Sequence, residues 1–347
     1  MRITILCPHL RIAGGVRAIL TYADRLAARG HAVELIVPTR GYLRTLRRRL
    51  GGHRPGWMPG FRGAVRWVDQ WRPERLPAAD VVMATAWQSA PVVDAAPDAC
   101  GAKFYFIQHY ESLYHGDAEL VDATYRLPLR KLVISTWLGD IMRKRFGSEA
   151  EILVTPVDPA LFHPVAALKR GRPRVLMLHH AYAWKGVADG LEAVARARRT
   201  VPEIELVGFG LKAPPPSVPY DDFHLDPPQP RLAWLYSSCE IYLCPSWDEG
   251  LGMPPMEAMA CGAALVTYDN GGCRDYARDG ETALVAPRRD VAALADRLAR
   301  LAGDPKLRAE IAAAGQRLVT TAFDWQRAVD RMEALFASVT SSRASAS

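Results

Sequence analysis

Short apolar runs and helix-periodic segments alternate along the first part of the chain. Ile3–Cys7 is a continuous apolar run, and Ala32–Val37 is another, which Pro38 closes. Between them, the apolar residues of Val16–Ala28 are spaced so that they share one helical face, and Gly30 follows as a stop signal. A strand, a helix and a second strand in this order predict a parallel sheet covered by helices.

The same alternation continues to about residue 165. Three more apolar runs predict buried strands, at Val81–Ala84, Phe104–Ile107 and Leu132–Ile134. A helix is predicted at Trp137–Phe146, with Ser135 or Thr136 as its N-cap. Residues 39–76 interrupt the pattern, and we interpret them as a basic insertion that carries three tryptophans, Trp57, Trp67 and Trp71.

A second α/β pattern follows residues 166–173, which are polar and basic with Gly and Pro, as in a linker. The predicted strands are Val175–Leu178, Glu205–Gly208, Ile241–Cys244, Ala264–Tyr268 and Ala283–Val285. The predicted helices are Val187–Arg198, Pro255–Ala260, Asp290–Leu301 and a last amphipathic helix, Phe323–Phe336. We expect one domain at residues 1–165, a second at 166–322, and a disordered tail at 341–347.

Composition and charge narrow the picture. The 347 residues are 49% hydrophobic and 23% charged, as in an ordinary soluble globular protein. Residues 1–165 hold 22 Lys and Arg against 15 Asp and Glu, so the whole net charge of +7 lies in the first half. Much of it falls between Arg40 and Arg75, a stretch that would attract phosphates or anionic lipid headgroups, or that serves only solubility. Nucleic-acid binding is disfavoured because the charge is confined to one segment and no known module is present.

The cysteines and the N-terminus indicate a reducing compartment. The six cysteines form no CxxC pair, and most stand in apolar contexts that predict buried thiols. The first apolar run is too short for a secretory signal, and no segment approaches the ~20 apolar residues of a membrane span. We expect a cytoplasmic protein, with peripheral contact to the inner face of the membrane as a hypothesis.

The most specific stretch is Pro245–Gly262, PSWDEGLGMPPMEAMACG, between a predicted strand and helix. Its segment Gly250-Leu251-Gly252 permits close backbone approach, and the amides of the helix N-terminus can bind an anion. Glu249 and Glu257 flank these donors, and each carboxylate can accept hydrogen bonds from a pair of hydroxyls. This arrangement suits a ligand that has hydroxyls on both sides of a phosphate, as a nucleotide sugar does. The simpler alternative is that Glu257 stabilises its helix N-terminus and Glu249 caps a turn.

This stretch resembles the E-x7-E signature of retaining GT-B glycosyltransferases, in the large family 4 also described as glycosyl transferases group 1. The segments that extend the likeness are Leu206–Gly210, Leu235–Ser246, Asn270–Pro287, Val157-Asp158 with Phe162–Pro164, and Gly14-Gly15. The resemblance implies two Rossmann-like parallel-sheet domains that face each other across a cleft. It also implies that the C-terminal helix, residues 323–340, crosses back to the N-terminal domain, which binds the acceptor.

By this resemblance, Glu249 contacts the hydroxyls of the donor sugar and Glu257 the nucleotide ribose. The amides of Gly250, Leu251 and Gly252 would hold the diphosphate. Lys185, in Trp-Lys-Gly, matches the family's phosphate-binding lysine, which would neutralise the leaving pyrophosphate. A solvated lysine at a helix start is the alternative, although the helix dipole disfavours an unpaired cation there.

One departure concerns the arginine that the family has five or six residues before this lysine. Here these positions hold His180 and His179, and either could donate to phosphate with less charge near neutral pH. We assign His180 to the donor site. A zinc site is disfavoured because no third ligand has suitable spacing.

The first half contributes four candidate residues. Gly14 and Gly15 lie in a predicted strand-to-helix loop, and by the resemblance they close over the donor. His109 follows the strand Phe104–Ile107 and resembles a family histidine near the donor sugar, with a hydrogen-bonded structural histidine as the alternative. Glu111 is a weaker candidate for acceptor contact.

The resemblance implies a hexosyltransferase that retains anomeric configuration and needs neither a cofactor nor a metal, in agreement with the absence of a DxD motif. The expected partners are a nucleotide-sugar donor and a glycan or lipid-linked acceptor in bacterial O-antigen or capsule assembly. An epimerase or phosphorylase, or a non-catalytic nucleotide-sugar-binding subunit, remains as an alternative. A dinucleotide oxidoreductase is disfavoured because neither glycine pair completes G-x-G-x-x-G before a helix.

Overall fold

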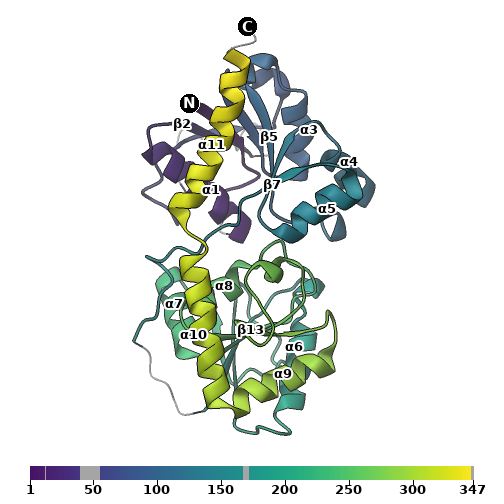
Figure 1. The fold of residues 1–347 in the computed structure, drawn as a ribbon, viewed down its shortest axis with the longest axis vertical. Coiled ribbons are helices and arrows are strands. Elements are labelled where there is room, and N and C mark those ends of the chain that lie inside the picture. The colour runs from purple at the N-terminus through teal and green to yellow at the C-terminus, as the bar shows by residue number, and fades with distance from the viewer. Residues whose placement is uncertain (12, 40–54, 167–171, 345–347) are drawn as a thin grey trace. The chain divides into compact units, whose positions relative to one another are not determined.

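The chain folds into two units, each built on one parallel sheet (Figure 1). The computed structural model describes residues 1–11, 13–39, 55–166 and 172–344. The N-terminal unit comprises Met1–Thr155 with Gln326–Ser347, and the C-terminal unit comprises Pro156–Trp325. The division at Thr155 precedes the expected linker, and the first unit is discontinuous in sequence. We describe each unit by itself.

The N-terminal unit has a seven-stranded sheet in the order β3-β2-β1-β4-β5-β6-β7, in which every neighbouring pair is parallel. The strands are β1 Arg2–Leu6, β2 Ala32–Pro38, β3 Ala64–Val68, β4 Val81–Ala84, β5 Ala102–Ile107, β6 Arg130–Val133 and β7 Ala150–Ile152. The α-helices are α1 Gly14–Ala28, α3 Ala90–Asp94, α4 Ala118–Tyr125, α5 Thr136–Phe146 and α11 Trp325–Ala344. Short 3-10 turns η2, Trp87–Ser89, and η4, Glu111–Leu113, follow β4 and β5.

The C-terminal unit repeats this plan with a six-stranded parallel sheet in the order β10-β9-β8-β11-β12-β13. The strands are β8 Arg174–Leu178, β9 Glu205–Gly210, β10 Asp222–Leu225, β11 Ile241–Cys244, β12 Ala264–Tyr268 and β13 Ala283–Ala286. The α-helices are α6 Val187–Ala197, α7 Gln229–Ser238, α8 Met253–Ala260, α9 Val291–Gly303 and α10 Pro305–Thr321. In both sheets the strand order reverses beside the first strand, as in Rossmann folds.

The central strands are fully buried because their residues are apolar on both faces. Capping side chains begin several helices: the Ser135 hydroxyl accepts from the Leu138 amide, and the Asp290 carboxylate accepts from the Ala293 amide. Gly147 ends α5 in the left-handed conformation that glycine adopts without strain. All six cysteines are buried free thiols, as the sequence predicted.

The interpretation of residues 39–76 as an insertion is wrong for its second half, because β3 pairs with β2 and extends the sheet. The tryptophans help to attach this segment to its own unit. The Trp57 and Trp71 indoles donate to the backbone carbonyls of Leu10 and Ile36, and Trp67 is buried. Residues 40–54, with six of the arginines that carried the charge argument, lie outside the described residues.

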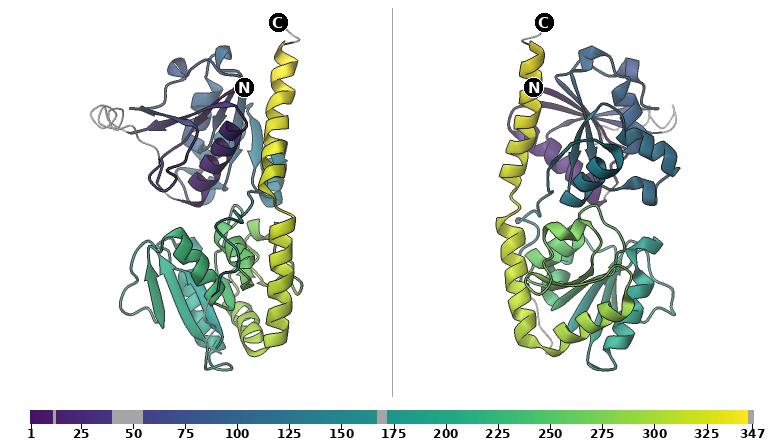
Figure 2. Two further views of the ribbon diagram at one scale, coloured as in Figure 1. Left: turned by 90° about the vertical axis from the view of Figure 1, so that its left-hand side faces the viewer. Right: turned by 45° about the vertical axis from the view of Figure 1, so that its right-hand side comes forward.

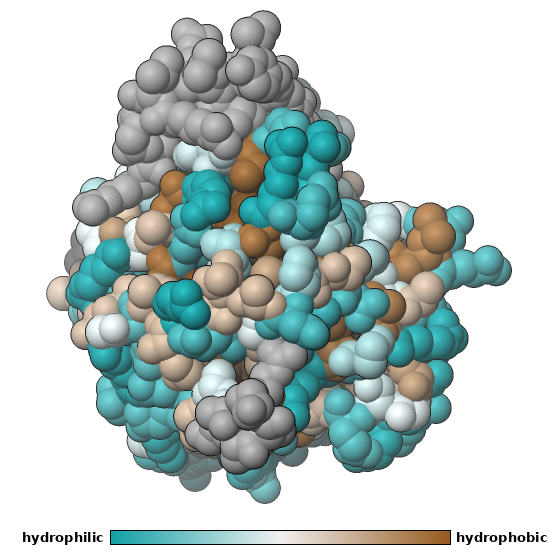
Figure 3. All heavy atoms as spheres, turned by 90° about the horizontal axis from the view of Figure 1, so that it is seen from above, coloured by the Kyte–Doolittle hydropathy of each residue, from teal (hydrophilic) through white to brown (hydrophobic). Residues whose placement is uncertain are grey.

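Two arginines of the described basic stretch are paired with acidic residues of the same unit. Arg66 forms an ion pair with Glu34 at 2.9 Å, and Arg62 approaches Asp24 to 3.4 Å. Among the described residues, no helix combines the length and the apolar character that crossing a membrane requires. On the face seen in Figure 3, hydrophilic and apolar residues are interspersed.

The last helix, α11, returns to the N-terminal unit (Figures 1 and 2). Phe336 is fully buried, and its ring meets the Phe104 ring edge-on at a centroid distance of 4.9 Å. Glu333 accepts from Arg29 at 2.7 Å and from His31 at 2.6 Å. Helix α11 continues to Ala344, into the segment expected to be a tail.

The aromatic contact predicts that α11 contributes strongly to the stability of the N-terminal unit. We expect Phe336→Ala to lower the free energy of unfolding of this unit by about 3–5 kcal/mol, because it leaves a cavity beside Phe104. Urea denaturation followed by circular dichroism measures the change. Ser338→Ala on an exposed position of the same helix is the control and should stay within about 0.5 kcal/mol of wild type. Equal stabilities of the two variants would contradict the assignment.

Candidate functional site

The candidate site of the C-terminal unit lies where its strand order reverses. Strands β8 and β11 are hydrogen-bonded neighbours, with Met177 paired to Leu243. Because they are parallel, the loops that follow them leave the same edge of the sheet. In open α/β sheets, ligands bind at this edge, beside the point of reversal. The sequence places Lys185 in the first of these loops and Glu249 in the second.

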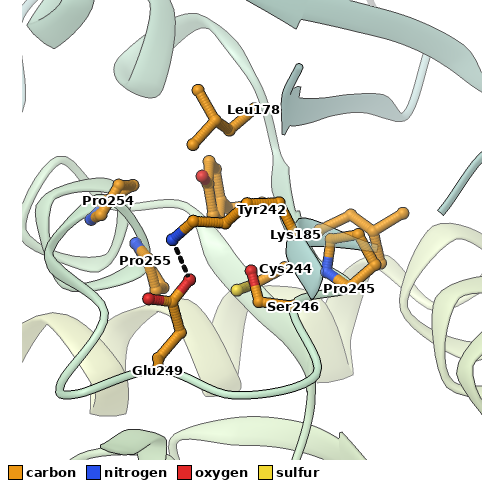
Figure 4. A pocket seen from close by; sticks show the side chains of 10 residues that line it. Leu178, Lys185, Tyr242, Cys244, Pro245, Ser246, Glu249, Pro254 and Pro255 are labelled. Atoms are coloured by element: carbon orange, nitrogen blue, oxygen red, sulfur yellow. Dashed lines mark hydrogen bonds and ion pairs between the residues drawn. The ribbon is translucent and has the colours of Figure 1, made fainter. Parts of the chain in front are cut away.

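Lys185 and Glu249 meet in a pocket at this edge (Figure 4). The Lys185 ammonium donates to Oε1 of Glu249 at 2.6 Å, and the two side chains are 20% and 11% exposed. Such a charge-assisted hydrogen bond is shorter and stronger than a neutral one. The pocket is lined by Leu178, Lys185, Tyr242, Leu243, Cys244, Pro245, Ser246, Glu249, Pro254 and Pro255.

Gly186 explains how the two loops come so close. It adopts the left-handed conformation, with φ of 65°, and caps α6. A Cβ atom at this position would lie 1.9 Å from the carbonyl oxygen of Pro245. Only glycine therefore lets the β8–α6 loop rest against the end of β11, which brings the preceding Lys185 within reach of Glu249.

The segment Gly250–Gly252 is held against the start of α8 by buried groups. The Tyr276 hydroxyl donates to the carbonyls of Leu251 at 3.0 Å and Gly252 at 3.3 Å. Gly272 packs so closely behind the loop that a Cβ there would lie 2.7 Å from its backbone. Gly252 caps α8 with φ of 91° and offers no side-chain acceptor to the first-turn amides. The two helix residues after Met253 are prolines without an N–H, so the donors available to an anion here would be the Met253 amide and the backbone amides of the glycine segment.

Glu257 lies on α8, beyond its first turn, and is 2% exposed. Its Oε2 atom accepts a hydrogen bond from the Tyr236 hydroxyl of α7 at 3.1 Å. A carboxylate beyond the first turn does not stabilise the helix N-terminus, which was the simpler alternative for Glu257. The side chain of Glu249 reaches Lys185, so it does more than cap a turn.

The two histidines after β8 have different surroundings. His179 hydrogen-bonds the Tyr220 hydroxyl at 3.1 Å and packs edge-on against that ring, which gives it a structural role. His180 accepts from the Tyr182 amide through Nδ1 at 3.1 Å. Burial and the nearby Lys185 charge lower the pKa of His180, so it is neutral at pH 7. With Nδ1 accepting, the proton of this neutral ring lies on Nε2, which can donate.

The N-terminal unit places its candidates at the carboxyl ends of β1 and β5. Gly14 is the first residue of α1, and a Cβ added to it would meet no atom within 4 Å. A Cβ on Gly15 would lie 3.3 Å from the Gln108 amide oxygen. The His109 ring lies near the rings of Tyr114 and His115, with centroid distances of 6.2 and 5.9 Å. The structure thus brings Gly15 toward the segment that carries His109.

Glu111 is engaged inside the N-terminal unit. Its Oε2 atom accepts from the Trp87 amide at 3.1 Å, and its own amide donates to the Tyr125 hydroxyl at 3.0 Å. The Tyr125 hydroxyl also donates to the His109 carbonyl at 3.4 Å. Burial raises the pKa of Glu111 to about 7, an effect that hydrogen bonds from Trp87 and Tyr105 partly offset. The Glu111 carboxyl thus links the loop after β5 to the loop after β4 through a hydrogen bond. Its contact with a sugar acceptor stays a prediction.

Several supporting residues had no signal of their own in the sequence. Tyr236 and Tyr276 are buried tyrosines whose hydroxyls reach site segments more than 20 positions away. Asn270, buried before η6 Gly272–Asp275, accepts the Glu249 amide on its carbonyl at 3.0 Å. Arg288 forms an ion pair with Asp248, the neighbour of Glu249. Such roles depend on tertiary contacts, which spacing along the chain does not reveal.

The raised pKa of Glu111 predicts how stability depends on pH. Below pH 4.5 the Glu111 carboxyl is protonated in both the folded and the unfolded protein. Between pH 4.5 and 7 it ionises only in the unfolded chain, so the free energy of unfolding falls as the pH rises. Glu111→Gln should therefore gain up to about 3 kcal/mol relative to wild type between pH 4.5 and 8. Urea denaturation at pH 4.5, 6 and 8 measures this, with exposed Glu119→Gln as the control. A pH-independent difference would refute the assignment.

Comparison with known proteins supports the fold and the family resemblance. Residues 161–318 match the family model described as glycosyl transferases group 1. The O-antigen biosynthesis protein RfbC of Myxococcus xanthus is 32% identical over 286 residues, 79% of this chain and 22% of that protein. A D-inositol 3-phosphate glycosyltransferase of Thermomonospora curvata is 36% identical over 105 residues, 30% of this chain and 24% of that protein. The chain thus spans about a quarter or less of the length of these two relatives.

Solved structures share the fold over nearly the whole chain. Sucrose-phosphate synthase from Thermosynechococcus elongatus has a TM-score of 0.79 at 18% identity and covers 98% of this chain and 99% of its own. Anabaena HepE, solved in complex with UDP and glucose, has a TM-score of 0.75 at 15% identity and covers 97% and 100%. The two Rossmann-like units therefore have the GT-B fold. Residues 161–318, which include Lys185, Glu249 and Glu257, belong to the glycosyl transferases group 1 family.

Proposed function

We propose that this protein transfers a hexose from a nucleotide-diphosphate sugar to a hydroxyl of a glycan or lipid-linked acceptor, with retention of anomeric configuration. The observation that carries the proposal is the ion pair of Lys185 with Glu249, 2.6 Å long, beside the glycine segment at the start of α8. A cation, a carboxylate and the backbone amides of the glycine segment together suit a ligand that combines phosphates with hydroxyls.

Each part of such a donor has a matching group. The Lys185 ammonium and the backbone amides of Gly250–Gly252 would bind the two phosphates, and His180 would add a neutral N–H donor. Glu249 would accept hydrogen bonds from hydroxyls of the transferred sugar. Glu257, which Tyr236 orients, would accept from the ribose hydroxyls. Relatives support the donor class, since HepE was solved with UDP and with UDP-glucose.

In the reaction, the bond between the anomeric carbon and the phosphate oxygen breaks, and negative charge grows on the leaving diphosphate. Lys185 and the amides of the Gly250–Gly252 segment would stabilise that charge, and preorganised donors of this kind are usually the largest contribution to catalysis. The acceptor hydroxyl attacks the same face of the sugar and gives its proton to the leaving phosphate oxygen. Neither a metal nor a covalent enzyme intermediate is part of this scheme.

The acceptor would bind in the N-terminal unit, at the carboxyl edge of its sheet. His109 would polarise or position the attacking hydroxyl there, and Glu111 would act through the loop that it shares with His109. The likeness to the Myxococcus xanthus O-antigen biosynthesis protein supports a cell-surface glycan as the acceptor class. A lipid-linked glycan would bring the protein to the inner face of the membrane, where the basic stretch from Arg40 to Arg75 would meet anionic headgroups.

Thermal-shift measurements with UDP, GDP, dTDP and CMP, and with their sugar conjugates, test the donor site. We expect one base series to raise the melting temperature, because a ligand that binds only the folded state stabilises it. Glu257→Gln should reduce the shift, whereas Glu281→Gln, at an exposed position of the same unit, should preserve it. If no nucleotide shifts the wild-type melting temperature, the donor site is refuted.

Transfer of radiolabelled sugar to lipid-extract acceptors tests the reaction itself. We expect Lys185→Ala to lower kcat by about 10²- to 10³-fold, the usual cost of removing one donor to a developing anion. EDTA should leave the wild-type rate unchanged. Consumption of the donor in the absence of any acceptor would instead indicate an epimerase, and donor binding without turnover a non-catalytic subunit.

A further inference from the structure

We propose that Arg288 is a positioning residue for Glu249, acting through the two residues that precede it, Trp247 and Asp248. The proposal rests on the function assigned to Glu249 above. Arg288 itself follows β13 and lies outside the E-x7-E segment. Its role would be to keep the Glu249 carboxylate aligned with Lys185 and with the hydroxyls of the donor sugar.

The contacts of Arg288 are directed at the segment before Glu249. Its Nη2 atom forms an ion pair with Oδ2 of Asp248 at 2.5 Å, and its Nε atom donates to the Trp247 carbonyl at 2.9 Å. The Arg288 side chain is 48% exposed, but that of Asp248 is only 9% exposed. Removal of the guanidinium would leave a buried carboxylate without this ion pair, so the segment would have to rearrange.

The same segment is also tied to the loop that carries Lys185. The Trp247 amide donates to the Trp184 carbonyl at 2.8 Å, directly before Lys185. The Trp247 indole donates to Oδ2 of Asp189 on α6 at 2.9 Å. The two partners of the catalytic ion pair are therefore each one or two residues from this cross-link. A shift of Trp247 and Asp248 would move Glu249 relative to Lys185.

The fork of the arginine side chain suits this task. It binds the Trp247 carbonyl and the Asp248 carboxylate at once, so it fixes both the position and the direction of the backbone where the loop leaves β11. Lysine could keep the charge beside Asp248 but could not reproduce both hydrogen bonds. Arg289, its neighbour, carries the same charge and instead lies over the Trp247 ring at 4.2 Å. Because Arg289 also touches Trp247, the control is Arg300, an exposed arginine of α9.

A double-mutant cycle in urea unfolding tests the inference without any ligand. Glu249→Gln, Arg288→Ala and the double variant are compared with wild type. If Arg288 aligns Glu249 with Lys185, the effect of Glu249→Gln on the unfolding equilibrium constant should be at least fivefold smaller in the Arg288→Ala background. The Arg300→Ala background should preserve the full effect, and Arg288→Lys should restore part of it. Additive effects within twofold would overturn the proposal.

Binding of UDP and UDP-glucose gives a second readout that a general loss of structure would not produce. Because Glu249 is assigned to the sugar, Arg288→Ala should weaken UDP-glucose at least fivefold more than it weakens UDP. Equal weakening of both ligands would argue against positioning of Glu249. If wild type binds neither ligand nor any other nucleotide, the proposed function fails, but the unfolding cycle still decides the role of Arg288.

Discussion

The ion pair between Lys185 and Glu249 depends on the parallel pairing of β8 and β11, two strands far apart in the chain. Parallel neighbours release their following loops at the same edge of the sheet, so a residue from each can meet there. Gly186 then removes the last steric obstacle, because any side chain would collide with the Pro245 carbonyl. A cation and a carboxylate held 2.6 Å apart at a pocket are the centre of the proposed donor site, and the surrounding contacts keep their backbones in place.

Buried tyrosines supply much of that support. Tyr236 holds Glu257, Tyr276 holds the glycine segment before α8, and Tyr268 approaches the Asp189 carboxylate that also binds Trp247. Burial raises the pKa of Tyr276 well above its ordinary value, so its hydroxyl stays protonated and donates at any pH at which the protein folds. Rigid aromatic rings carry these hydroxyls at little cost in conformational entropy. The polar groups of the site are thereby fixed before a ligand arrives.

Prediction of the strands succeeded where both faces of a strand are buried and failed at strands on the edges of the sheets. The bounds of β11 and β12 agree with the apolar runs from which they were predicted, because both strands are buried on two faces. Strands β3, β7 and β10 were missed, since each is an edge strand with mostly exposed or partly exposed residues. Helix α10 was missed because it buries only a narrow stripe, Ile311, Gly315 and Val319. At such positions, the contacts of the neighbouring element decide the conformation.

The sequence by itself determined the buried strands, the alternation of strands with helices, the two-unit plan, and the glycines and glutamates of the segment from Pro245 to Gly262. Those features depend on local patterns, which spacing displays. Only the tertiary structure decided that His180 rather than His179 lies beside Lys185, that Glu111 bonds the Trp87 amide, and that Arg288 reaches Asp248. These pairings join residues from different loops of a sheet. The strand order and the directions of buried side chains set them, and neither follows from the pattern along the chain.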